Sequence, residues 1–274
     1  MRLLSAVVRP LDQNKPRPVR SQPYSHAEPN YNDNFMSTLA LVRHGQASFF
    51  AENYDQLSPL GEQQARLLGQ YWLERGVRFD TIFTGPRVRQ IETAALAGEA
   101  FARAGLPWPE PQSLPELDEH QVDRLIKSKI ADITHEFPKV GPLYEAYQAA
   151  EDPYDRHRTF QLMFEQVVML WVNEKIGADG VESWPEFQQR VQAGMRKLTA
   201  GEGSGRRIAA FTSVGAITVG LQYAIGCGER AAFDLGWRVR NCSVTEFVFS
   251  GDRVTLDGFN ALAHLQDPEL WTYR

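Results

Sequence analysis

Most of this chain alternates short apolar runs with longer segments whose apolar residues recur at helical spacing. Residues 38–45, TLALVRHG, form an apolar run that breaks into polar residues, as a buried strand does where it leaves a sheet. Residues 58–76 place apolar side chains every three or four positions, which predicts a helix. Ser58 suits the N-cap of this helix, Pro59 its first turn and Gly76 its end.

The same alternation returns further along the chain. Residues 79–86 (FDTIFTGP) read as a second buried strand, and residues 88–105 as the helix after it. Residues 207–215 (RIAAFTSVG) and 216–226 repeat the pair, whereas residues 243–260 predict a hairpin at the sheet edge. Strands that alternate with helices are typical of parallel sheets. We therefore expect a three-layer α/β/α sandwich with a mainly parallel sheet.

The stretch from about residue 117 to 183 departs from this alternation. It is charged and rich in aromatic residues, and segments such as 158–177 (RTFQLMFEQVVMLWVNEKIG) predict helices with no strand pattern between them. Residues 182–200 predict one more helix before the third strand. We expect a single α/β domain over residues 36–274 that carries a helical cap insertion at about 117–183.

The first 35 residues differ from the rest of the chain. They are rich in Pro, Asn, Arg and Ser and lack apolar periodicity, which predicts a disordered extension at residues 1–35. The apolar run before Arg9 and Pro10 is too short for a secretory signal peptide, and no small-residue cleavage pattern follows it. Met36 precedes the first predicted strand directly, which makes it a candidate native start.

Composition and charge narrow the classes of partner. The 274 residues are 43% hydrophobic and 23% charged, with a formal net charge of −5. This balance is typical of globular proteins and does not favour nucleic acid or a membrane as a partner. Cys227 and Cys242 form no C-x-x-C motif and read as reduced thiols, so we expect a cytoplasmic protein. No metal or organic cofactor is implied, and the oligomeric state stays open.

Candidate chemistry gathers where the predicted strands end. Arg43, His44 and Gly45 follow the first strand, Arg89 lies one turn into the helix after the second, and residues 212–215 follow the third. Ligands bind at the carboxyl ends of parallel strands. An arginine fork matches phosphate oxygens, an imidazole nitrogen can accept a phosphoryl group, and a glycine lets the backbone approach an anion. These residues predict a phosphoryl-transfer site.

Such a site also needs an acid to protonate the leaving oxygen. Residues 114–119, LPELDE, offer Glu116, with Glu119 as the reserve candidate. His120, in the same loop, is expected at the surface or facing the pocket from the cap.

Five motifs in the right order resemble the histidine phosphatase superfamily, the phosphoglycerate-mutase-like proteins. LVRHGQAS and then LSPLGEQQA resemble the opening of that family, and FTGPRVRQIETA resembles its second strand and helix. Leu114-Pro115-Glu116 aligns with its L-x-E motif, and residues 260–265 (NALAHL) with its N-x-x-x-H-L motif. The resemblance covers residues 38 to about 265 apart from the insertion.

The resemblance implies hydrolysis of a phosphomonoester through a phosphohistidine on His44. It implies that Arg43 and Arg89 bind the phosphoryl oxygens and that Glu116 is the general acid. The substrate is expected to be a phosphate ester on a small molecule or a protein. Six further positions are assigned to substrate binding: Gly45, Gln46, Ser58, Ser213, Val214 and Gly215.

One position departs from the family pattern. Where the family has a second histidine in S-H-G-G, this chain reads Ser213-Val214-Gly215-Ala216. Losing one charge-assisted hydrogen bond costs about 1.5–3 kcal/mol, or about one to two decades in rate if the transition state feels it. Ser213 and the N–H groups of the next helix could take over part of this role. The alternative is a non-catalytic phosphate-binding module, and a mutase is a weaker third option.

Overall fold

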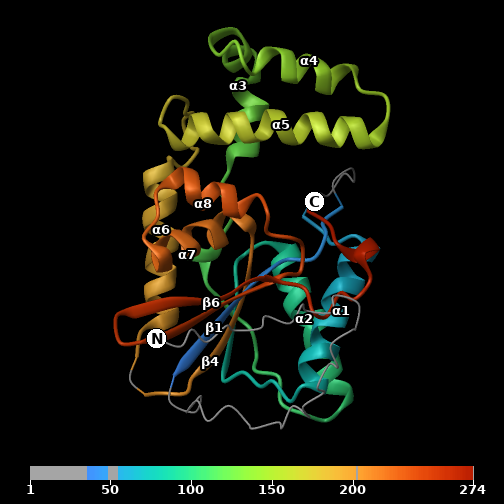
Figure 1. Ribbon diagram of the computed structural model, residues 1–274, viewed down its shortest axis with the longest axis vertical. Coiled ribbons are helices and arrows are strands. Elements are labelled where there is room, and N and C mark those ends of the chain that lie inside the picture. The colour runs from blue at the N-terminus through green and yellow to red at the C-terminus, as the bar shows by residue number, and fades with distance from the viewer. Residues whose placement is uncertain (1–35, 49–54, 202, 274) are drawn as a thin grey trace, which may run out of the picture. The chain divides into compact units, whose positions relative to one another are not determined.

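A computed structural model describes residues 36–48, 55–201 and 203–273 (Figure 1). The predicted disorder of residues 1–35 lies outside the described residues. The elements in chain order are β1 (Ser37–Arg43), α1 (Pro59–Glu74), β2 (Thr81–Thr84), α2 (Val88–Arg103), β3 (Gln112–Ser113), η1 (Pro115–Leu117), α3 (Val122–Glu136), α4 (Gly141–Ala149), α5 (Pro153–Val172), α6 (Trp184–Thr199), β4 (Arg207–Thr212), α7 (Val214–Ile225), α8 (Glu229–Gly236), β5 (Val244–Ser250), β6 (Arg253–Ala261) and η2 (Pro268–Leu270).

The strands form a single six-stranded sheet in the order β3-β2-β4-β1-β5-β6. The first four of these pair in parallel, and β5 and β6 add an antiparallel hairpin at one edge. The predicted mainly parallel sheet and its edge hairpin are therefore confirmed. Because β1 lies in the middle, its carboxyl end meets the ends of β2 and β4 at one edge of the sheet.

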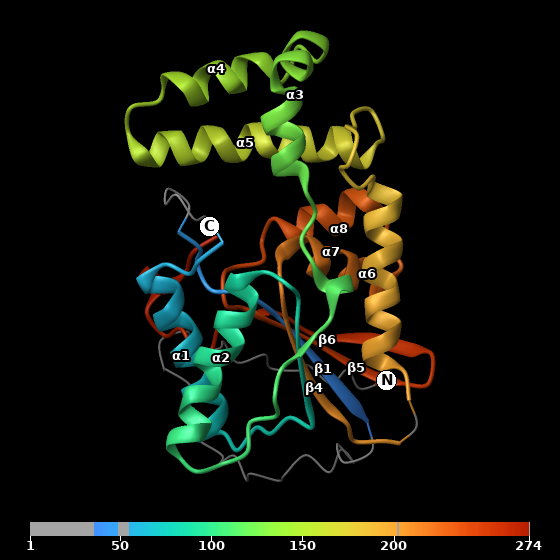
Figure 2. The same cartoon turned by 180° about the vertical axis from the view of Figure 1, so that it is seen from behind.

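Alternating side chains of β1 divide the core between the two faces of the sheet. Ala40 and Val42 pack with α1 and α2, whereas Leu39 and Leu41 pack with α6 and α7. Figures 1 and 2 show these two helix pairs on opposite faces of the strands. This period of two is what a strand buried on both faces requires, and it produces the expected three layers.

The helix starts follow local sequence signals. Ser58 is the N-cap of α1, where its Oγ accepts a hydrogen bond from the N–H of Gly61 at 3.1 Å. Ser183 and Glu186 form a reciprocal capping box at the start of α6. Gly226 ends α7 in the left-handed region, at φ 70°.

Helices α3, α4 and α5 occupy the region between the second and third βα units, and the described residues there contain no strand beyond β3. Figure 2 shows α3 leading away from the sheet to α4 and α5, which lie side by side. An apolar core rich in aromatic side chains joins α3 and α5 to α6, α7 and α8. The cap is thus packed onto the helical layer of one sheet face.

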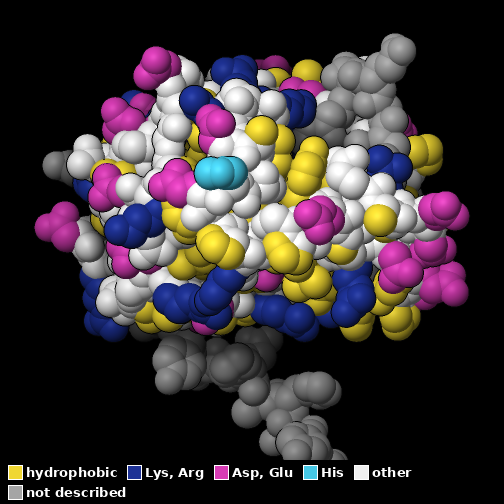
Figure 3. Space-filling view, turned by 90° about the horizontal axis from the view of Figure 1, so that it is seen from above, with side chains coloured by type: hydrophobic (Ala, Val, Ile, Leu, Met, Phe, Trp, Pro, Cys, Tyr) yellow, Lys and Arg dark blue, Asp and Glu magenta, His cyan; other side chains and the backbone are white. Residues whose placement is uncertain are grey.

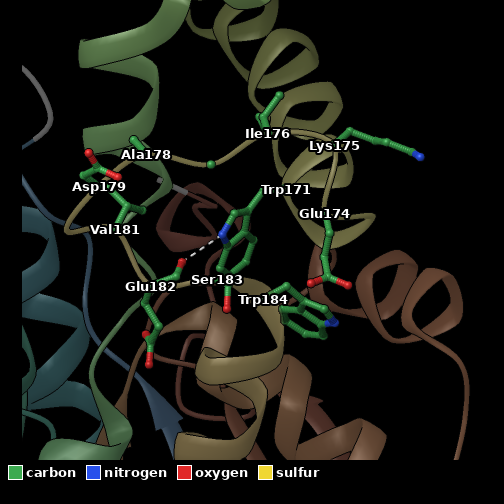
Figure 4. A pocket seen from close by; sticks show the side chains of 11 residues that line it. Trp171, Glu174, Lys175, Ile176, Ala178, Asp179, Val181, Glu182, Ser183 and Trp184 are labelled. Carbon is green, nitrogen blue, oxygen red and sulfur yellow. Dashed lines mark hydrogen bonds between the residues drawn. The ribbon is translucent and has the colours of Figure 1, made fainter.

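The connection between α5 and α6 lines an open pocket of about 430 Å³. The Trp171 indole N–H donates to the carbonyl of Glu182 at 2.9 Å across it, with Trp184 beside them (Figure 4).

Seen from above, the outer surface interleaves acidic, basic and apolar side chains (Figure 3). Within the described parts of the chain, no helix combines the length and apolarity needed to cross a bilayer.

Helices α1 and α2 are in close contact at Gly69. A Cβ atom there would lie 2.0 Å from the carbonyl oxygen of Ala97. We therefore expect Gly69→Ala to lower the free energy of unfolding by about 1–3 kcal/mol, because the helices must separate to accept the methyl group. Chemical denaturation of the two proteins measures this. Gly177→Ala is the matched control, since nothing lies within 4 Å of the added methyl group. Equal stability of both variants would contradict the close contact.

Candidate active site

The backbone of His44 is fixed by the elements around it. Its N–H donates to the carbonyl of Thr212 at the end of β4, at 2.9 Å. Its carbonyl accepts from the Asn241 side chain at 3.2 Å and from the N–H of Cys242 at 3.1 Å. Cys242 adopts the left-handed region, at φ 59°, which costs energy for a residue with a Cβ. Three hydrogen bonds therefore hold the backbone from which the imidazole projects.

The His44 ring is oriented by a hydrogen bond on each nitrogen. Nδ1 donates to the carbonyl of Gly45 at 2.7 Å, and Nε2 accepts from Nε of Arg89 at 3.1 Å. An arginine has only donors, so Nε2 must carry a lone pair and the proton must be on Nδ1. Only 6% of His44 is exposed. The nitrogen able to attack an electrophile is therefore Nε2.

Charge and burial keep this imidazole neutral. Burial is the largest influence lowering the pKa of His44, followed by the charges of Arg89 and Arg43, and the hydrogen bond to Gly45 opposes them only in part. The pKa of His44 therefore lies well below its ordinary value of 6.5. A neutral imidazole is the form that acts as a nucleophile.

Arg89 projects from the first turn of α2 and is almost fully buried. Its Nη1 donates to Oδ1 of Asp55 at 2.6 Å, and Oδ2 of Asp55 accepts from the N–H of Val88 at 3.1 Å. Asp55 thus balances the charge of Arg89 and satisfies an N–H at the start of α2. Sequence reasoning missed Asp55, because it stands 34 positions from Arg89 outside any motif.

Arg43 lies close enough to influence His44 but points its fork elsewhere. Its Nη1 donates to the carbonyl of Val239 at 2.6 Å, and its Nη2 donates to the carbonyl of Tyr273. The guanidinium therefore contacts backbone oxygens of the C-terminal region in this structure, and its contribution at His44 is the charge that lowers the pKa.

The two candidate acids lie in different surroundings. Glu116 contacts Lys197 of α6, and the charges that lower its pKa belong to Lys197 and Arg190. Glu119 instead accepts from the N–H of Gly215 at 3.2 and 3.3 Å, and the charge of Arg89 acts on its pKa. The side chain of Glu116 is turned toward Lys197 of α6, and its assignment as the general acid stays a prediction. The reserve candidate Glu119 lies near Arg89.

At the start of α7, the Ser213 hydroxyl and the Gly215 N–H have protein partners. The hydroxyl of Ser213 accepts from Nε2 of Gln90 at 2.8 Å, and the N–H of Gly215 donates to the carboxylate of Glu119. Val214 packs against the apolar cluster on the α6 and α7 face of the sheet. The idea that Ser213 and the α7 N–H groups take over part of a histidine's role at the phosphate stays a prediction.

Gly45, Gln46 and Ser58 join the end of β1 to α1. A Cβ at Gly45 would lie 2.5 Å from the carbonyl oxygen of Gly61, so close helix packing requires glycine there. The backbone N–H of Gln46 donates to the side-chain oxygen of Gln64 at 2.9 Å. The side-chain oxygen of Gln46 accepts from the hydroxyl of Ser58 at 2.8 Å. These contacts support the loop that carries His44.

Within the described ranges, no three His, Cys, Asp or Glu side chains are grouped as a metal site.

Comparisons with known proteins agree on one family. The family model described as the histidine phosphatase superfamily (branch 1) matches residues 39–262. The 2,3-bisphosphoglycerate-dependent phosphoglycerate mutase of Thermobifida fusca is 42% identical over 79 residues, which are 27% of this chain and 31% of that protein. The chain thus spans about a third of that relative's length. The mutase of the same name from Zymomonas mobilis is 27% identical over 185 residues, covering 63% and 81% of the two chains.

Solved structures share the fold at low identity. Mycobacterial hydrolase 1 superposes with a TM-score of 0.57 at 21% identity, over 82% of this chain and 99% of that one. The phosphoglycerate mutase from Bacillus anthracis gives 0.56 at 19% identity, over 85% and 96%. Both comparisons support the fold described above.

The lowered pKa of His44 has a measurable consequence. Between the folded pKa and about 6.5, the unfolded chain binds a proton at this residue that the folded protein does not. His44 therefore makes the folded state lose stability as the pH falls below about 6.5. We expect ¹H–¹⁵N NMR at pH 6 to show a neutral ring with its proton on Nδ1. A titration midpoint at or above 6.5, or a proton on Nε2, would contradict the assignment.

Proposed function

This chain belongs to the histidine phosphatase superfamily (branch 1), and from that premise we propose that it hydrolyses phosphate monoesters through a phosphohistidine at Nε2 of His44. The observation that carries the proposal is the hydrogen-bond pair on the imidazole. It leaves Nε2 unprotonated and directly beside Arg89, a donor that matches phosphate oxygens.

In the first step, Nε2 of His44 attacks phosphorus and the bond to the leaving oxygen breaks. The leaving oxygen takes its proton from Glu119. In the second step, water attacks the phosphohistidine, Glu119 takes a proton from that water, and phosphate departs with Nε2 restored. Ester and water give alcohol and phosphate, and the enzyme returns to its starting state. Arg89 stabilises the charge on the phosphoryl oxygens in both steps.

Binding of the phosphate requires Arg89 to exchange partners. Its Nε faces the His44 lone pair and its Nη1 faces Asp55, so an incoming phosphate competes with both contacts. Once Arg89 turns to the phosphate, the lone pair of Nε2 is free to attack. Arg89 thus holds a hydrogen bond to the lone pair of Nε2 before the substrate arrives, and it binds the phosphate afterwards.

We assign the general acid to Glu119. Burial raises the pKa of Glu119, but His120, the N–H groups of His120 and Gly215, and Arg89 together hold it below its ordinary value. A phosphate bound at Arg89 adds negative charge nearby and opposes that ionisation. The carboxyl is therefore expected to gain its proton when the substrate arrives, which suits a general acid.

Two other functions remain candidates. The relatives from Thermobifida fusca and Zymomonas mobilis are named as mutases, and a mutase must protect its phosphohistidine from water. Val214, in place of the family's second histidine, adds no positive charge for that task. A non-catalytic phosphate-binding module would use Arg89 without transfer, and it predicts phosphate-competitive binding with no phosphohistidine. The substrate class we favour is a phosphate ester on a small molecule or a protein.

The nucleophile is tested by trapping the intermediate. We expect the wild-type protein to release phosphate from p-nitrophenyl phosphate and, after acid-free quenching, to carry a phosphoryl group on His44 by mass spectrometry. His44→Ala should lose both signals, because Nε2 is the atom that forms the bond. Phosphate release unchanged in His44→Ala, or none from the wild type across a panel of phosphate esters, would exclude the proposed function.

The acid is tested by a matched pair of variants. Glu119→Gln should lower kcat for an alkyl phosphate such as glycerol phosphate by about 10²–10⁴-fold, because the poor leaving group needs the proton. Glu116→Gln should change kcat by less than about threefold, since its side chain contacts Lys197 outside the site. Steady-state rates of the two variants decide between them. A large loss of kcat in Glu116→Gln with little loss in Glu119→Gln would assign the general acid to Glu116.

A further inference from the structure

His120 is buried, in contrast to the surface position expected for a loop histidine. Only 7% of it is exposed. Its ring lies among Phe164 and Trp171 of α5 and Phe187 of α6, with ring centroids 6.1, 5.5 and 5.7 Å away. Apolar packing alone would be served better by a phenylalanine, because an imidazole must also satisfy two polar nitrogens.

One edge of this ring faces the carboxyl of Glu119. Nε2 of His120 lies 3.7 Å from Oε1 of Glu119, and the backbone N–H of His120 donates to the same oxygen at 3.0 Å. Nδ1, on the other side, has no hydrogen-bond partner among the residues that the structure describes. A proton is better placed on the nitrogen that faces a carboxylate than on one without a partner, which puts a proton on Nε2.

The first turn of α7 makes room for this pair. A Cβ at Gly215 would lie 2.2 Å from Oε1 of Glu119 and 2.8 Å from Cδ2 of His120. The N–H of Gly215 donates to both carboxylate oxygens, at 3.2 and 3.3 Å. Oε1 therefore meets two backbone donors and the ring of His120, whereas Oε2 has only the longer contact with Gly215.

We propose that His120 is a positioning residue for the general acid: its Nε2–H, held by the aromatic side chains of α5 and α6, fixes Oε1 of Glu119 so that Oε2 is presented to the leaving oxygen. The inference rests on the proposed function. Oε2 gives its proton to the leaving oxygen in the first step and takes one from water in the second. The proton on His120 stays in place throughout.

Leaving-group dependence separates this role from simple packing. A good leaving group such as p-nitrophenolate needs little help from an acid, whereas an alkoxide needs a well-placed proton. We expect His120→Phe, which fills the same space, to lower kcat/KM for glycerol phosphate by about 10- to 100-fold. Because kcat/KM reports the steps up to departure of the leaving group and not the later hydrolysis of the phosphohistidine, the same variant should lower kcat/KM for p-nitrophenyl phosphate by less than about threefold. His120→Gln, which keeps an N–H donor, should recover part of the lost rate.

Three controls sharpen the comparison. His135→Phe makes the same replacement at an exposed position of α3 and should leave both rates unchanged. Glu119→Gln should show the same selective loss as His120→Phe, and the double variant should lose little more than Glu119→Gln alone, because the two residues act as one unit. Thermal melting confirms that each variant is folded. Equal loss on both substrates, no loss on either, or additive losses in the double variant would overturn the positioning role.

A spectroscopic measurement tests the arrangement without turnover. ¹H–¹⁵N NMR of the wild type should place a proton on Nε2 of His120, and the Nε2 resonance should shift in Glu119→Gln but not in Glu116→Gln. A neutral ring protonated on Nδ1 alone would overturn the inference, whatever the activity. If the wild type neither turns over nor forms phospho-His44, the proposed function fails instead, and this spectrum still decides how His120 faces Glu119.

Discussion

The hydrogen bond from Arg89 to Nε2 of His44 is the contact on which the site depends. A buried imidazole can accept from an arginine only while it is neutral, so the contact sets the charge, the tautomer and the direction of the ring together. It also requires two distant parts of the chain to meet, the end of β1 and the first turn of α2. The parallel sheet meets this requirement, because the loops after β1, β2 and β4 emerge at the same edge.

Two buried arginines beside one neutral histidine need compensation in the absence of a ligand. Asp55 supplies a carboxylate for Arg89, and the carbonyls of Val239 and Tyr273 supply oxygens for Arg43. An unpaired buried charge would be strongly destabilising, so these oxygens contribute to the stability of the folded state. In the proposed mechanism, a phosphate competes with Asp55 for Arg89.

The sheet, its edge hairpin and the grouping of His44 with Arg89 could be predicted from sequence, because each depends on local periodicity or on a short spacing from a strand end. The acid could not. Leu114-Pro115-Glu116 and Leu117-Asp118-Glu119 are the same L-x-E pattern three residues apart, and only the turn at η1 separates their directions. Asp55 was equally inaccessible, since a single aspartate in a loop carries no signal of the arginine it will meet. Helix α8 was also missed, because eight residues are too few for the helical period to repeat clearly.

The aromatic surroundings of His120 tie the acid loop to the body of the cap. Phe164 and Trp171 belong to α5, the longest cap helix, and the residue they hold is the direct neighbour of Glu119. A cap of this kind is not an interchangeable module. In the proposed mechanism, a change in α5 that repacks Phe164 or Trp171 would also act on the carboxyl of Glu119.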